Sequence, residues 1–382
     1  RLVDTVIERH PLLYSSEERV ATIAAEQRRK LREGMSAIGL YRVLATVVEA
    51  LECGHSNLQM SRDYMEALGA TERLLPLRVE VNDGRLIVSE SLRPEKLPTG
   101  SRVLSINDRE GEDILEMLLA GVTSDGTNRT SKIAKINRQF AYYYHLLVDD
   151  GGSFRVRYTT REAETERLAL LSGASARDLF GPNRELSSIG VYMDIPRMRH
   201  DFSGSVTTEE AYLRVGSFIL DQREFADFLE GFFREVREQG SEKLTVDLRG
   251  NWGGPPRGSA LLFSCLMQEP AAYLDESAPW FFSRYARPLE KPEEAFAGEL
   301  TVLIDGAVFS TTAHFVSLID HHDRGTLVGE TTGGSAACTD SSRWLQLRNS
   351  GLRLYYATRV YSTPAPKQAD GRGIEPDRSL ES

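Results

Sequence analysis

Apolar residues recur at helical spacing over the first part of the chain. Leu40, Val43 and Val47 fall on one face of a predicted helix that runs to about Leu51. Earlier, Ser16 is followed by two glutamates and then by apolar positions, which is typical of a helix start. This pattern predicts a helical N-terminal domain over residues 1–72.

The spacing changes from helical to alternating after Leu74. Residues 75–90 contain two alternating runs joined by Asn82-Asp83-Gly84, a sequence that favours a β-hairpin. Further strands are predicted at 101–107, 153–161 and 166–170, and helices at 113–119 and 128–148. Together these elements predict a β-rich domain over residues 73–173.

Strands and helices alternate along the rest of the chain. Strands are predicted at 211–218, 244–246 and 301–304, and helices at 225–239, 260–267 and after Phe309. Such alternation is typical of an α/β domain, here assigned to residues 174–382.

Composition narrows the classes of function. The 382 residues include 46 Lys and Arg and 56 Asp and Glu, a net charge of −10, which disfavours nucleic acid as a partner. No apolar run approaches the ~18 residues of a transmembrane segment. Cys53, Cys265 and Cys338 are widely spaced and fit buried thiols or one disulfide. Because no phosphate loop or metal-spaced cluster occurs, we expect no cofactor and no metal.

Ser310 lies where a strand turns into a helix. The strand ends at Asp305-Gly306, and helical spacing begins after Phe309. Serine is a favoured N-cap residue, so capping alone would explain it. A serine at this place also lies beside unpaired N–H groups and the positive end of the helix dipole, which suit an alkoxide or a tetrahedral oxyanion.

A second glycine-rich turn follows the predicted strand at 244–246. Its sequence is DLRGNWGG, residues 247–254, and its glycines allow unusual backbone angles and close approach of a substrate. Free N–H groups there would form half of an oxyanion hole. For Asp247 and Arg249 we favour a structural ion pair that holds the loop.

Four motifs occur in order: DLRGNWGG, FSTTAHF, TLVGETTGG and GRGIEPD. With them the chain resembles the tail-specific, or C-terminal processing, serine peptidases, and HPLLY and GHS near its start resemble the helical domain of exported members. The resemblance implies a crotonase/ClpP-like catalytic core, a PDZ-like domain in the β-rich region and a location in the cell envelope or periplasm.

The resemblance also implies roles for individual residues. Ser310 is the expected nucleophile, Thr311 one oxyanion donor, and Gly253 or Gly254 the other. The family's general-base lysine is replaced here by Ser335.

The tricorn-core branch of the family instead uses a histidine, and His55 is the matching residue. A histidine near its ordinary pKa can activate a serine at neutral pH. His314 is the main alternative, followed by His321 and His322.

The group that would orient the histidine stays open. Asp370 and Glu375 lie in the terminal motif, and Glu330, Ser56 and Ser335 are further candidates. The sequence therefore predicts a serine peptidase acting on peptides or proteins, and a homo-oligomeric state stays open. The alternatives are a non-catalytic peptide- or ligand-binding relative and a hydrolase of other esters or amides.

Overall fold

A computed structural model describes residues 2–71, 73–161, 163–181, 200–292, 295–366 and 370–380. The chain divides into two compact units. Unit 1 consists of residues 1–123, 132–192 and 341–358, and unit 2 of residues 124–131, 193–340 and 359–382. Each unit is described by itself. None of the helices in the described ranges has the length and apolar character that a membrane span requires.

Unit 1 begins with helices, as the apolar spacing predicts. They are α1 (Leu2–Arg9), α2 (Glu17–Arg28), α3 (Ala37–Glu49) and α4 (Arg62–Ala70). The Ser16 side chain accepts a hydrogen bond from the Arg19 N–H, which confirms the expected helix start.

The end of α3 corrects one expectation. The sequence predicts that this helix runs to about Leu51, and Glu52, just beyond that point, has a positive φ of 49°. The helix ends earlier, at Glu49, and the Glu52 carboxylate lies 3.1 Å from the Arg19 guanidinium.

A β-rich sheet and its helices complete most of unit 1. The sheet order is β2-β3-β4-β6-β7, with β5 paired to β4. The predicted hairpin is confirmed, because Asp83 and Gly84 have φ of 49° and 74° between β2 and β3. The elements are β2 (Leu77–Asn82), β3 (Arg85–Ser91), β4 (Arg102–Ile106), β5 (Arg109–Glu110), α5 (Gly111–Leu119), α6 (Arg129–Leu147), β6 (Ser153–Thr160), β7 (Ala163–Ser172) and α7 (Ala176–Phe180).

A hairpin from near the C-terminus also belongs to unit 1. Strands β16 (Arg343–Gln346) and β17 (Arg353–Tyr356) pair with each other, and β17 also pairs with β1 (Asn57–Gln59). One apolar core contains the N-terminal helices, the β-rich sheet and this hairpin. The chain enters each of the two units more than once.

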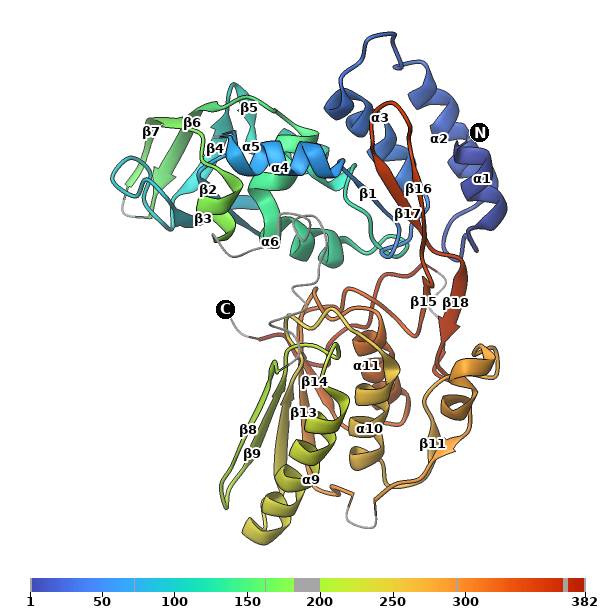
Figure 1. Ribbon diagram of the computed structural model, residues 1–382. Helices are drawn as coiled ribbons and strands as arrows, with labels where there is room; N and C mark the ends of the chain where they lie inside the picture. Colours follow the sequence, from blue (N-terminus) through green and yellow to red (C-terminus); the bar gives the residue numbers. More distant parts are fainter. Residues whose placement is uncertain are drawn as a thin grey trace. The chain divides into compact units, whose positions relative to one another are not determined.

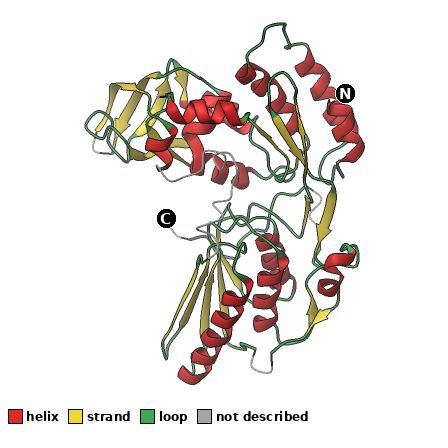
Figure 2. Cartoon of the chain, in the orientation of Figure 1, coloured by secondary structure: helices red, strands yellow, loops and turns green. Residues whose placement is uncertain are grey.

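Unit 2 is built on a five-stranded sheet of order β14-β13-β10-β9-β8. The first four strands are parallel, and β8 is antiparallel to β9. Three helices lie along one side of it (Figures 1 and 2). These elements are β8 (Phe202–Val206), β9 (Ala211–Val215), α9 (Gln222–Gln239), β10 (Lys243–Asp247), α10 (Pro256–Leu266), β13 (Glu299–Ile304), α11 (Thr311–His321) and β14 (Thr326–Gly329).

The remaining elements of unit 2 are short. β11 (Ala271–Ala272) pairs with β12 (Pro288–Leu289), with the 3₁₀ helix η2 (Trp280–Ala286) between them, and β15 (Ala337–Asp340) pairs with β18 (Arg359–Ser362). Cys53, Cys265 and Cys338 are buried thiols that form no disulfide. The parallel strands all end at one edge of the sheet, the usual place for a site in α/β folds.

Candidate active site

Ser310 occupies a strained turn between β13 and α11. Its φ of 55° and ψ of −130° lie where residues with a side chain are rarely found. It is the N-cap residue of α11, yet its side chain makes no capping hydrogen bond. Strain of this kind concentrates at functional sites, and a strained strand–turn–helix exposes the nucleophile in many hydrolases. A capping role therefore does not explain why a serine occupies this position.

Asp305 ties this turn to residues 248–254, which we call the glycine loop. Its carboxylate accepts hydrogen bonds from the Ala307 N–H and the Gly250 N–H, each at 3.0 Å. Burial raises the pKa of Asp305, while these two donors act to lower it. The carboxylate thus fixes the exit of β13 against the glycine loop.

Asn251 holds the glycine loop to the first turn of α11. Its completely buried side chain accepts hydrogen bonds from the Gly253 N–H at 2.9 Å and the Thr312 hydroxyl at 2.7 Å. Its amide donates to the Val215 carbonyl at 3.0 Å. Because all these groups are satisfied, the network fixes a single loop geometry. Sequence reasoning missed this residue, although it lies inside the DLRGNWGG motif.

The backbone of Gly253 lies directly against Ser310. A Cβ atom on Gly253 would lie 2.8 Å from Ser310 Cβ and 2.9 Å from the Phe309 carbonyl oxygen. Its φ of 99° also excludes most other residues. Glycine is thus required here by both space and backbone conformation.

We expect Gly253→Ala to lower peptide turnover by about 10²-fold, because the added methyl group displaces the turn that positions Ser310. Steady-state kinetics, with circular dichroism to verify folding, would measure this loss. Gly231→Ala is the control, because Gly231 lies within α9 and only the end of the Arg234 side chain lies within 4 Å of its added Cβ. Equal turnover of Gly253→Ala and wild type would contradict the close-contact argument.

Two backbone N–H groups at the turn are available to a ligand. The Gly253 N–H donates to the Asn251 side-chain oxygen at 2.9 Å. Among the described residues, the N–H groups of Gly254 and Thr311 have no hydrogen-bond acceptor. The Thr311 N–H also lies at the positive end of the α11 dipole.

Residues 330–335 also pack against the turn that bears Ser310. The Gly334 N–H donates to the Val308 carbonyl at 3.1 Å, and a Cβ on Gly334 would lie 3.2 Å from the Ser310 nitrogen. Ser335, at the place of the family lysine, is buried and donates its hydroxyl to the Ala337 carbonyl at 3.1 Å.

Asn128 links the C-terminal segment, residues 370–377, to residues 330–335. The Asn128 amide donates to the carbonyls of Thr332 and Arg372, both at 2.8 Å, and its side chain is buried. The Asp370 carboxylate lies 3.4 Å from Arg372 Nε, and Glu375 is exposed. Sequence reasoning missed Asn128, because nothing near it in the chain indicates so distant a partner.

Asp247 and Arg249 form the structural ion pair that the sequence favoured. The Arg249 guanidinium donates to both Asp247 oxygens at 2.9 and 2.8 Å, and the Tyr212 hydroxyl donates at 2.6 Å. Burial raises the pKa of Asp247, but the hydrogen bonds from Arg249 and Tyr212 outweigh it and lower the pKa to about 2. The carboxylate therefore stays ionised beneath the glycine loop.

His55 lies in unit 1, on a loop held by several hydrogen bonds. Ser56 is completely buried, and its hydroxyl donates to Cys53 Sγ at 3.1 Å and accepts from the Ala357 N–H at 3.2 Å. The buried Lys135 ammonium donates to the Gly54 carbonyl at 3.2 Å. This loop gives His55 a fixed backbone within its unit.

Comparison with known proteins identifies a family domain in the later part of the chain. Residues 209–380 match the model of peptidase family S41, and this range contains the Ser310 turn, the glycine loop and the terminal motif. The protein carries a serine peptidase domain of family S41. No curated protein sequence matches the chain.

Two solved structures, both of mature CPAF, share the fold of this chain. Mature CPAF is similar with a TM-score of 0.65 and 15% identity, covering 94% of this chain and 86% of CPAF. Mature CPAF complexed with lactacystin has a TM-score of 0.64 and 15% identity, covering 94% and 87%. The photosystem II D1 C-terminal processing protease has a TM-score of 0.47 and 13% identity, covering 99% and 91%.

Proposed function

We propose that this S41 peptidase hydrolyses peptide bonds with Ser310 as its nucleophile. The observation behind this is the strained backbone of Ser310, whose side chain caps no helix, beside two unpaired N–H groups. The Ser310 oxygen bonds to the carbonyl carbon and loses its proton to a base. The N–H groups of Thr311 and Gly254 then stabilise the oxyanion. The amine leaves with that proton, and water releases the acyl group.

We propose His55 as the base that receives the Ser310 proton. The support is the tricorn-like GHS motif, together with Ser335 at the place where the processing peptidases have lysine. The rigid loop around His55 favours a defined role for its side chain. His314 is the rival, a buried residue of α11 whose N–H donates to the Ser310 carbonyl at 3.0 Å.

The carboxylate that orients His55 is proposed to come from the C-terminal segment. Asp370 and Glu375 are its two candidates. The Asp370 carbonyl accepts a hydrogen bond from the Thr127 N–H at 2.9 Å, so its backbone is fixed, and its carboxylate forms an ion pair with the exposed Arg372. We therefore favour Asp370.

We also propose a crotonase/ClpP-like core, a PDZ-like module and export of the protein to the cell envelope. The parallel sheet with helices along one side supports a crotonase/ClpP-like core, and the antiparallel sheet with α5 supports a PDZ-like module. Export to the cell envelope rests on family resemblance alone, and fractionation of cells with an antibody to the protein tests it.

Digestion of a peptide mixture, read by mass spectrometry with and without a fluorophosphonate, tests the proposed function. We expect cleavage that the fluorophosphonate abolishes, because it reacts with an activated serine. Lactacystin, with which mature CPAF was solved, is a second inhibitor to try. If the protein neither cleaves peptides nor reacts with the fluorophosphonate, a non-catalytic peptide- or ligand-binding protein is favoured. If it cleaves ester substrates but no peptides, a hydrolase of non-peptide esters or amides is favoured.

A further inference from the structure

Residues 124–131, which we call the brace, belong to unit 2, although the chain on both sides of them belongs to unit 1. A Cβ on Gly306 would lie 2.6 Å from the Thr130 carbonyl oxygen. A Cβ on Gly333 would overlap the Gly306 carbonyl oxygen and lie 3.2 Å from Ser131 Oγ. Because neither glycine has room for a side chain, the brace packs directly on the backbone between β13 and α11.

The side chain of Asn128 is the centre of the brace and is only 1% exposed. Its Oδ1 accepts hydrogen bonds from the Ser131 N–H at 2.7 Å and from the Thr130 hydroxyl at 2.9 Å. Because a backbone N–H can only donate, the Ser131 bond identifies the oxygen of this amide. The amide nitrogen therefore faces the carbonyls of Thr332 and Arg372, both at 2.8 Å. These four bonds give the side chain a single orientation.

Thr332 continues this network to the turn that bears Ser310. The completely buried Thr332 hydroxyl donates to the Gly334 carbonyl at 2.7 Å. The Gly334 N–H in turn donates to the Val308 carbonyl at 3.1 Å. A Cβ on Gly334 would lie 3.2 Å from the Ser310 nitrogen. Asn128 is thus connected to the backbone of the proposed nucleophile through a short series of buried contacts.

The brace also fixes the C-terminal segment, which carries Asp370. The Thr127 N–H donates to the Asp370 carbonyl at 2.9 Å, and a Cβ on Gly126 would overlap that oxygen. Further along the segment, the Ile374 N–H donates to the Thr332 hydroxyl at 2.8 Å. The same network therefore holds the backbone of the carboxylate that we propose as the partner of the base.

We propose that Asn128 is a positioning residue for the peptidase reaction, which holds the backbones of Ser310 and Asp370 in place through Thr332 and the C-terminal segment. This inference rests on the proposed function, which gives those two residues their roles. A displacement of about 1 Å at a reacting group lowers turnover on the order of 10²-fold. The effect should fall on kcat and not on KM, because a side chain this deeply buried cannot touch a bound peptide.

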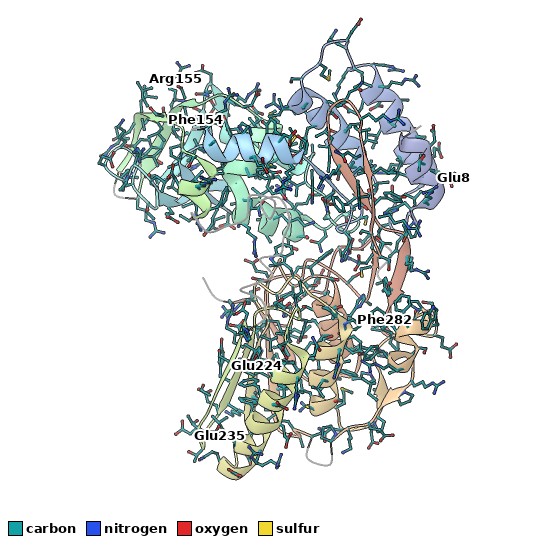
Figure 3. All side chains as sticks on the ribbon, viewed as in Figure 1. Glu8, Phe154, Arg155, Glu224, Glu235 and Phe282 are labelled. Atoms are coloured by element: carbon teal, nitrogen blue, oxygen red, sulfur yellow. The ribbon has the colours of Figure 1, made fainter. Side chains whose placement is uncertain are left out.

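Asn128→Asp tests the proposal, because a carboxylate of the same size cannot donate to two carbonyls. We expect kcat to fall by about 10–100-fold and KM to change by less than about 3-fold, at a temperature where circular dichroism shows a folded protein. Asn107→Asp is the control. The Asn107 side chain likewise accepts the N–H of Arg155, which Figure 3 labels on the β-rich sheet of unit 1, at 2.8 Å and donates to the Ser153 carbonyl at 3.1 Å. The control should lose stability without losing kcat, and wild-type kcat in folded Asn128→Asp would overturn the proposal.

Two variants of Thr332 make the test independent of whether Asn128→Asp folds. Thr332→Val removes the hydroxyl and should lower kcat as Asn128→Asp does, whereas Thr332→Ser keeps the hydroxyl and should restore kcat to within about 3-fold of wild type. The double variant Asn128→Asp/Thr332→Val should be little worse than either single variant, because both interrupt one network. Equal kcat for the two Thr332 variants, or fully additive losses in the double variant, would exclude this route to Ser310.

Hydrogen exchange read by mass spectrometry tests the positioning without any assay of activity. In Asn128→Asp, peptides that contain Gly334 should exchange about 10-fold faster than in wild type, while Asn107→Asp should leave them unchanged. Unchanged exchange in Asn128→Asp would overturn the positioning role whatever the activity. Faster exchange in a protein whose wild type neither cleaves peptides nor reacts with a fluorophosphonate would contradict the proposed function alone.

Discussion

Replacement of Ser310 by alanine is expected to lower peptide turnover about 10³-fold or more and to abolish labelling by a fluorophosphonate. The hydroxyl is the only atom removed, so the N–H groups of Thr311 and Gly254 remain for a bound carbonyl. Turnover is measured by steady-state kinetics and labelling by intact-protein mass spectrometry. Labelling of the alanine variant at the wild-type rate would show that another residue is the nucleophile.

Two further variants separate chemistry from folding. Ser310→Gly should be as inactive as Ser310→Ala but should melt at a higher temperature, because glycine adopts a φ of 55° without the strain of about 1–3 kcal/mol that other residues bear. Ser317→Ala removes a buried hydroxyl from the same helix, one that donates to the His314 carbonyl at 2.8 Å, and should keep most of the activity. A lower melting temperature for Ser310→Gly than for Ser310→Ala would contradict the assigned strain.

Features set by neighbouring residues could be predicted from the sequence. The Ser16 cap, the Asn82-Asp83-Gly84 hairpin and the strand–turn–helix around Ser310 depend on contacts within a few residues. The ion pair of Asp247 and Arg249 is local in the same sense. Even so, the backbone strain at Ser310 is imposed by the surrounding structure, and sequence reasoning could predict only the turn.

Features that join distant parts of the chain could not be predicted. Strand β17 of the β16–β17 hairpin pairs with β1, almost 300 residues earlier in the chain. Apolar residues of both strands belong to the core of unit 1. Asn128 bonds to Thr332 and Arg372 across more than 200 residues. The spacing of polar residues along the sequence does not indicate such distant partners. The hydrogen bond from the Gly253 N–H to the Asn251 side chain likewise could not be predicted from the motif.

Replacement of His55 by alanine is expected to reduce turnover about 10³-fold or more, because an unassisted serine hydroxyl is a poor nucleophile near neutral pH. With histidine as the base, kcat/KM of the wild type should rise with pH at a lower pH than a lysine base would give, because histidine is ordinarily the weaker base. The fold should survive, because the Ser56 hydroxyl and the Lys135 ammonium hold the loop through hydrogen bonds to its backbone and to Ala357.

The matched variant His314→Asn decides between the two histidines. His314 is buried within α11, so its replacement is expected to lower the melting temperature, while its effect on kcat should stay within about 10-fold if it has no part in proton transfer. His200→Ala controls for a histidine outside both proposals, since His200 lies 2.8 Å from the Glu224 carboxylate on the surface of unit 2. If His55→Ala keeps wild-type turnover and His314→Asn loses it, His314 of α11 is the group that receives the Ser310 proton. The tricorn-like assignment of His55 as the base would then be wrong.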